Sequence, residues 1–198
     1  MTSTGAGVGP VERQRADARR NYERILAVAA EEVAVQGADA SLEQIARVAG
    51  VGSATVRRHF PTRRALLEAV SQQRIETLCA RAGELGGRDG DGRGALLEWL
   101  GEVLAYCVTA RGLATALSYD ADHDPVGGNS CAAALIEAGE PLLRSAAREG
   151  AVAPQVTVED LITLTVGLAL ATEHHPEPTA RAETLLGLAV AGISPDRV

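Results

Sequence analysis

Apolar side chains recur every three or four residues through most of the chain, which is the spacing of one face of an α-helix. The first such stripe runs from Asp17 to Gln36, where Ile25, Ala29 and Val33 share a face. Gly37 follows it, and glycine is the residue that most readily ends a helix. We find no stretch that we would assign to a strand, so the pattern predicts an all-α fold.

Two short helices are expected after the first stripe. Ser41 is a suitable N-cap for one of them, and Gln44, three residues later, completes a capping box. Gly50 ends that helix because glycine tolerates the positive φ of a tight turn. The second short helix is expected from about Ser53 to Phe60, and a longer helix from about Arg63.

These two short helices have the organisation of a helix-turn-helix. Ala46 is small enough to let two helices approach, Gly50 suits the turn, and Val56 is an apolar anchor on the second helix. If Val56 and Phe60 face inward, the other side of this helix is free to enter the major groove of DNA. The spacing therefore predicts a DNA-binding module.

The residues predicted to contact DNA lie on the second short helix and at the start of the next. Arg58 suits a guanine edge and Thr55 a thymine methyl group, while the flanking basic residues would meet phosphates. An ordinary solvated surface is the alternative for His59, Arg63 and Arg64. The full predicted set is Ser53, Ala54, Thr55, Arg57, Arg58, His59, Arg63 and Arg64.

Charge is divided unevenly along the chain. The net charge is −7, and all 19 basic residues are arginine. Residues 1–74 hold 11 arginines and 8 acidic residues, whereas residues 75–198 hold 8 arginines and 18 acidic residues. A basic module joined to an acidic body is typical of a protein that binds a polyanion at one end.

The segment from Arg19 to Leu78 resembles the DNA-binding domain of the TetR/AcrR family of bacterial transcriptional regulators. The resemblance is carried by the stretch ILAVAAEEVAVQGADASLEQIARVAGVGSATVRRHFPTRRALLEAV. It implies a homodimer with an N-terminal DNA-binding domain and a C-terminal domain that binds a small-molecule inducer. Two positions differ from the family pattern. Gly52 stands where Ser or Thr is usual, so Ser53 is expected to take over capping, and Arg57 stands where Tyr is usual.

Three parts follow along the chain. Residues 1–16 are expected to be a disordered arm, residues 17–78 the TetR-type helix-turn-helix DNA-binding domain, and residues 79–198 a helical ligand-binding and dimerisation domain. The glycine-rich stretch Gly83–Gly94 is expected to be a loop. The arginines of the arm either reach a DNA groove or belong to a plain tail; they are Arg13, Arg15, Arg19 and Arg20.

Four further helices are expected at residues 95–117, 129–150, 157–175 and 179–193. The last two are apolar on both sides, and such a helix needs two partners. We expect one partner to be the same helix pair of a second subunit, and a single deeper core is the alternative. The predicted dimer residues are Leu161, Leu164, Leu168, Leu185, Leu188 and Ala189.

The ligand pocket is expected among the middle helices. Trp99, Tyr106, Cys107 and Tyr119 combine apolar surface with a few polar groups, which suits a small apolar ligand. Core packing is the alternative for each of them. No cofactor is expected. The acidic stretch Tyr119–Pro125 has the oxygen and imidazole groups that bind metals, but we interpret it as a solvated loop and expect no metal.

The remaining features point to a cytoplasmic regulator. No apolar run is long enough to cross a membrane, the N-terminus lacks the order of a secretory signal, and three scattered cysteines do not form a disulfide framework. We expect a repressor of a palindromic operator, released by an inducer. Two other classes are an enzyme using Cys107 or Cys131 with His123, for which no motif is visible, and a helical interaction module that does not bind DNA.

Overall fold

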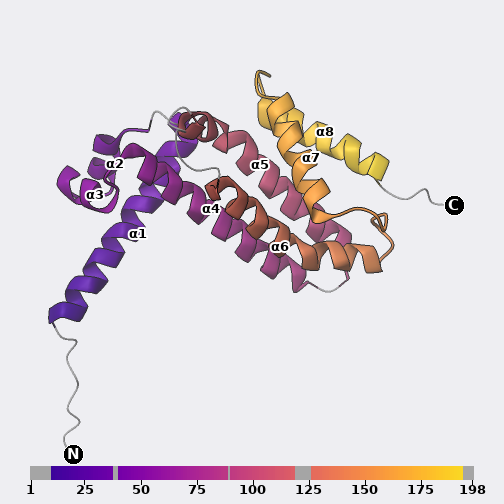
Figure 1. Cartoon of the computed structure of the whole chain (residues 1–198), viewed down its shortest axis with the longest axis horizontal. Helices are drawn as coiled ribbons and strands as arrows, with labels where there is room; N and C mark the ends of the chain where they lie inside the picture. Colours follow the sequence, from indigo (N-terminus) through magenta and orange to yellow (C-terminus); the bar gives the residue numbers. More distant parts are fainter. Residues whose placement is uncertain (1–9, 38–39, 89, 119–125, 194–198) are drawn as a thin grey trace, which may run out of the picture. The chain divides into compact units, whose positions relative to one another are not determined.

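The computed structural model describes residues 10–37, 40–88, 90–118 and 126–193, and these residues contain eight helices and no strand (Figure 1). The all-α prediction is therefore confirmed. The helices are α1 (Pro10–Gln36), α2 (Leu42–Val48), α3 (Ser53–His59), α4 (Arg63–Gly86), α5 (Gly92–Ser118), α6 (Val126–Arg148), α7 (Val158–Ala171) and α8 (Pro178–Ile193).

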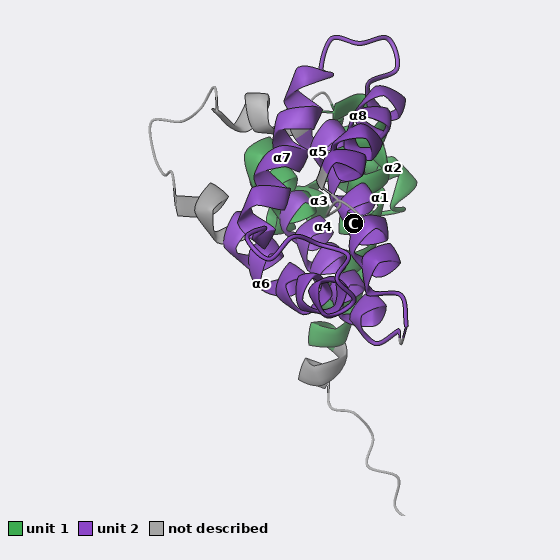
Figure 2. Ribbon diagram, turned by 90° about the vertical axis from the view of Figure 1, so that its right-hand side faces the viewer, with its two compact units in different colours: residues 1–70 green, residues 71–198 purple. Residues whose placement is uncertain are grey.

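The chain divides into two compact units, residues 1–70 and residues 71–198, shown in different colours in Figure 2. The division between Val70 and Ser71 falls inside α4. The sequence placed the domain boundary at residue 78, farther along the same helix. We refer to the two parts below as unit 1 and unit 2.

The first helix begins earlier than the sequence predicted. It starts at Pro10 rather than near Asp17, because proline has the φ of a first helical turn and lacks only an N–H that would have no helical partner there. Arg20 pairs with Asp17 at helical spacing and supports the early turns. Residues 10–16, which we assigned to the disordered arm, are thus helical, and residues 1–9 lie outside the described residues.

Unit 1 has one small apolar core to which each helix contributes. Ile25 of α1, Ile45 of α2, Val56 of α3 and Leu66 of α4 are each at most 1% exposed. The ring of Phe60 completes the core. Burial of these side chains is the main force that holds the two short helices, α2 and α3, against α1 and the start of α4.

The turns of unit 1 use the residues that the sequence singled out. Gly37 and Gly50 have φ of +59° and +64°, which favours glycine. The Ser41 hydroxyl accepts from the Gln44 amide at 3.3 Å, which confirms the N-cap of α2. The Gln44 side chain does not complete a capping box, because its carbonyl accepts from Arg47 instead.

In unit 2, α5 packs against α6, α7 and α8. Trp99 of α5 is fully buried and donates its indole N–H to the Leu78 carbonyl at 3.0 Å. The loop expected over Gly83–Gly94 is shorter than predicted, because α4 continues to Gly86 and α5 begins at Gly92. Burial of Leu85 outweighs the helix cost of glycine, about 1 kcal/mol per residue.

Acidic side chains cap helices in unit 2. Glu149 accepts from the amides of Gly92 and Arg93, at 2.7 and 3.2 Å, at the start of α5. Thr157 and Asp160 form the full capping box of α7 that the sequence indicated. Hydrogen bonds from the Thr157 hydroxyl and amide lower the pKa of Asp160. Among the described residues, no helix is long and apolar enough to span a membrane.

Candidate nucleic-acid interface

Helix α3 presents one side to solvent and keeps the other in the core of unit 1. Val56 and Phe60 are buried on the inner side. Ser53, Ala54, Arg57 and Arg58 are exposed, and Thr55 and His59 are half-buried. The division into inner and outer sides is the one that the helical spacing predicts, and DNA contact by the outer side chains stays a prediction.

The start of α3 has no side-chain cap. Gly52 is the N-cap, and its carbonyl accepts from the Thr55 amide at 2.8 Å. Our expectation that Ser53 takes over capping is wrong, because Ser53 is already the first helical residue.

The arginines of the predicted interface differ in how far they are paired within the protein. Arg57 Nη2 lies 3.1 Å from Glu43 Oε1, and Arg64 Nε lies 2.7 Å from Glu68 Oε1. Arg63 donates to the Ala40 carbonyl at 3.0 Å. Within the described part of the chain, Arg58 has no hydrogen bond or ion pair, so its guanidinium is free to bind a nucleic acid.

The sequence analysis treated these arginines as free positive charges and did not identify the acidic residues that pair with them. The pair between Arg64 and Glu68 has the i,i+4 spacing of a helix and could have been found from sequence. The pair between Arg57 and Glu43 joins two helices, and no local pattern indicates it. Glu43 is therefore a residue of this surface that sequence reasoning missed.

His59 lies in an aromatic cluster beneath the exposed side of α3. Its ring is 5.9 Å from that of Tyr22 at 68°, and Tyr22 stacks on Phe60 at 5.1 Å. The Nε2 atom of His59 is buried and has no hydrogen-bond partner among the described residues. The sequence predicts a phosphate contact for His59, and such a contact through Nε2 would require the ring to turn.

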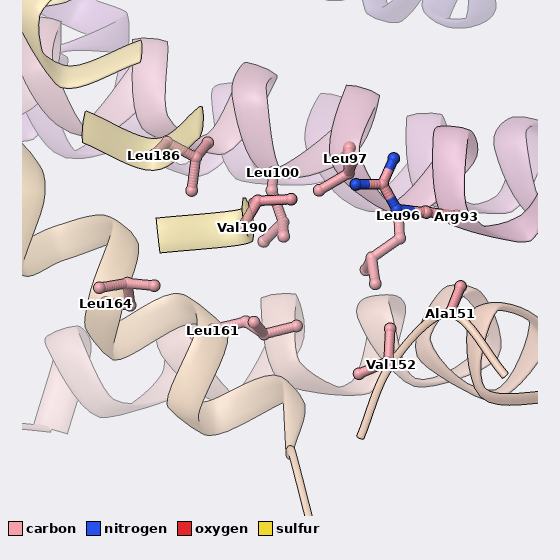
Figure 3. A pocket seen from close by; sticks show the side chains of 10 residues that line it. All are labelled: Arg93, Leu96, Leu97, Leu100, Ala151, Val152, Leu161, Leu164, Leu186 and Val190. Atoms are coloured by element: carbon pink, nitrogen blue, oxygen red, sulfur yellow. The ribbon is translucent and has the colours of Figure 1, made fainter. Parts of the chain in front are cut away.

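Unit 2 contains a pocket between α5, α7, α8 and the connection that precedes α7. Figure 3 shows side chains of α5 and α8 facing those of α7 and this connection. It encloses about 460 Å³ of atom-free space, part of which is open solvent. Among the described residues that line it, Arg93 alone is charged; the others are Leu96, Leu97, Leu100, Ala151, Val152, Leu161, Leu164, Leu186 and Val190.

Of the predicted pocket residues, Trp99, Tyr106 and Cys107 do not line this pocket. Trp99 is fully buried in the core, and Tyr106 and Cys107 are half-buried against it. Burial raises the pKa of the Cys107 thiol to about 11. Tyr119 and the acidic loop with Asp120, Asp122, His123 and Asp124 lie outside the described residues, as does the side chain of Cys131.

The outward face of α7 differs from the predicted one, whereas Leu188 of α8 is exposed as a dimer residue requires. Val166, Leu170 and Leu188 are 40%, 55% and 65% exposed. Leu161 is buried and lines the pocket with Leu164, so the predicted stripe turns toward its own unit. Hydrophobic spacing could not assign the outer face, because α7 is apolar on all sides. Leu168, Leu185 and Ala189 are half-buried.

An anchored helix-turn-helix joined to a larger helical body defines a DNA-binding regulator. Residues 25–70 match the model of the tetR family of bacterial regulatory proteins, and residues 91–195 match the model of the C-terminal domain of SbtR-like transcriptional regulators. The chain belongs to the TetR family of transcriptional regulators.

Solved structures agree with this assignment. The TetR regulator SCO0520 from Streptomyces coelicolor is 32% identical, with a TM-score of 0.70 over 88% of this chain and 99% of that one. A TetR regulator from Mycobacterium vanbaalenii is 31% identical, with a TM-score of 0.70 over 92% of this chain and 99% of that one. A gamma-butyrolactone receptor, 19% identical, shares the fold with a TM-score of 0.57 over 91% of each chain. No curated protein sequence matches the chain.

Proposed function

We propose that this TetR-family regulator is a ligand-responsive repressor that binds a palindromic operator as a homodimer. The observation that carries the proposal is the surface of α3, where Arg58, which has no partner among the described residues, stands on a helix anchored from behind by Val56 and Phe60. Rigid anchoring matters because base readout requires a side chain at a fixed place in the major groove. Arg63 and Arg64 at the start of α4 lie close by in the sequence and supply phosphate-binding charge.

Dimerisation is supported by the exposed apolar surface of α7 and α8. Val166 and Leu170 lie one helical turn apart on α7, and Leu188 is exposed on α8. In a single copy this surface is exposed to water, whereas an isologous contact buries the same surface on both subunits. Two-fold symmetry then presents two copies of α3 to half-sites about 34 Å apart, which requires an operator with palindromic sequence.

Ligand response is supported by the pocket of unit 2. Its apolar lining and single charged residue, Arg93, suit a small apolar molecule with one acidic or strongly polar group. One protein of the same fold is a gamma-butyrolactone receptor, and this likeness supports a ligand-binding role for unit 2.

The pocket and the proposed dimer surface use the same two helices. Leu164 of α7 and Leu186 of α8 line the pocket, so a ligand that moves them tilts the helices at the dimer contact. We infer that this tilt changes the spacing of the two recognition helices, with α4 as the covalent link between the units. A coupling of about 1–3 kcal/mol lowers operator affinity by roughly 5- to 150-fold, and binding to a bacterial operator places the protein in the cytoplasm.

Selection of duplexes from a random pool at a fixed salt concentration tests the proposal. We expect a palindromic sequence to be enriched and the enriched duplex to bind one dimer. Enrichment of a site without two-fold symmetry would contradict the palindrome, and failure to bind any duplex at low salt would contradict DNA recognition. Repeating the selection with Arg58→Ala identifies the base position that Arg58 reads.

A further inference from the structure

A negative charge from α2 lies beside the positive charges on the exposed side of α3. Glu43, in the first turn of α2, reaches across to Arg57 of α3, and their charged atoms lie 3.1 Å apart. The Ser41 hydroxyl donates to the second carboxylate oxygen of Glu43 at 3.4 Å and accepts from the Gln44 amide at 3.3 Å. Both oxygens of Glu43 are therefore within reach of a partner, one at Arg57 and the other at the N-cap of α2.

We propose that Glu43 is a positioning residue for DNA recognition, which holds Arg57 in an ion pair and withdraws its charge from the phosphates. The proposal rests on the proposed function. A neutral pair releases no counterion when DNA binds, so it adds nothing to the sequence-independent attraction. Arg58 next to it is unpaired among the described residues and keeps its full charge for base readout. Glu43 thereby favours the operator over other DNA.

The alternative is that Arg57 leaves Glu43 and binds a phosphate in the wild-type complex. Both side chains are well exposed, at 62% for Arg57 and 69% for Glu43, and an exposed pair of this kind contributes at most about 1 kcal/mol to stability. Loss of the pair therefore has little effect on folding. The salt dependence of DNA binding separates the two possibilities, because it counts the phosphates that the protein neutralises.

The experiment measures the affinity of the full-length protein for a mixed-sequence duplex and for the selected palindrome over a range of salt concentrations. With Glu43→Gln, we expect Arg57 to gain a phosphate, so the slope of log affinity against log salt steepens by about 0.9 per subunit. Raising salt from roughly 50 to 200 mM then costs this variant about 3.5-fold more affinity per subunit than the wild type. We expect Glu43→Gln to raise the affinity for the mixed-sequence duplex more than the affinity for the palindrome, because non-specific binding depends almost wholly on phosphate contacts.

Two further variants make the result specific to the pair. Glu31→Gln removes the same charge from an exposed position of α1 and should leave the slope unchanged. Arg57→Gln strands the Glu43 carboxylate beside the phosphates and should weaken binding to both duplexes. The double variant Glu43→Gln/Arg57→Gln should then recover the wild-type slope, because it restores the neutral surface.

Three outcomes overturn the proposal. A double variant whose slope is shallower than wild type by about 0.9 per subunit shows that Arg57 binds phosphate in the wild type. A slope unchanged in Glu43→Gln shows that the pair does not restrain Arg57, and an equal change in Glu31→Gln shows a general effect of charge. A wild-type protein that binds no duplex contradicts the proposed function itself, which distinguishes that failure from the other three.

Discussion

The indole of Trp99 lies directly against the backbone of Gly139. A β-carbon at position 139 would lie 2.8 Å from Cη2 and Cζ3 of the ring and 2.8 Å from Cγ1 of Val158. Trp99 and Val158 are both fully buried, so neither can move without disturbing its neighbours. This contact fixes how closely α5, α6 and the start of α7 approach one another in unit 2.

Replacing Gly139 by alanine should therefore destabilise the protein by about 1–3 kcal/mol through overpacking. Unfolding in urea, monitored by circular dichroism, measures the free energy of unfolding. Gly101→Ala in α5 is the matched control, because no atom lies within 4 Å of its β-carbon position; it should be neutral or stabilise by up to about 1 kcal/mol. Equal losses in the two variants would show that the contact with Trp99 does not limit the packing.

Arg58→Ala should weaken binding to the selected palindrome by about 1–3 kcal/mol, the range for one bidentate contact to a base. The loss should be smaller on a mixed-sequence duplex, because no correct base is presented there. Arg148→Ala, which removes an exposed arginine of α6, is the control and should bind as the wild type does. A loss of the same size on both duplexes would assign Arg58 to the phosphate backbone instead of the bases.

Leu188→Glu should convert the proposed dimer into monomers. Leu188 is 65% exposed in a single copy, so the variant should keep its helix content, while two buried carboxylates would oppose association. Sedimentation velocity at micromolar concentration measures the change. Val35→Glu, at a position that is 83% exposed on α1, should leave the mass unchanged, and a dimeric Leu188→Glu would exclude this face as the interface.

Cys107 should react slowly with alkylating reagents in the native protein. Burial raises its pKa to about 11, so at pH 8 its thiolate is less abundant than in the unfolded chain by a factor on the order of 100. The double variant Cys79→Ser/Cys131→Ser isolates this thiol, and iodoacetamide labelling with and without denaturant measures the ratio. Equal rates in the two states would show that Cys107 is accessible and would revive it as a candidate nucleophile.

The same thiol affects stability at alkaline pH. Because the folded-state pKa lies above the ordinary value near 9, folding favours the neutral thiol. Its stabilising contribution is full below pH 9 and is lost as the pH rises towards 11. The free energy of unfolding should therefore fall more steeply over this range in the wild type than in Cys107→Ser.

Features set by a few neighbouring residues could be predicted from the sequence. Gly37 and Gly50 have the positive φ that ends their helices, and Ser41 and Thr157 cap the helices that follow them. The inward side of α3 also follows from helical spacing. Each of these features depends on bonds within a turn or two of chain, so the local sequence contains the information.

Features set by distant residues could not be predicted in the same way. Glu149 caps α5 from far along the chain, and Glu43 pairs with an arginine of another helix. Trp99 resembled a pocket residue, but its indole has a backbone partner in Leu78, which only the packing reveals. The outer face of α7 was misjudged for a related reason, since an evenly apolar helix has no intrinsic inner side.

Trp99 is the only tryptophan of the chain, and it lies in the core of unit 2. Its fluorescence emission consequently reports the unfolding of residues 71–198, while the helical signal in circular dichroism reports both units. If the two curves separate during heating, the recognition helix and the ligand-binding body melt as independent cooperative blocks. The protein thus contains a built-in spectroscopic reporter for one of its two halves.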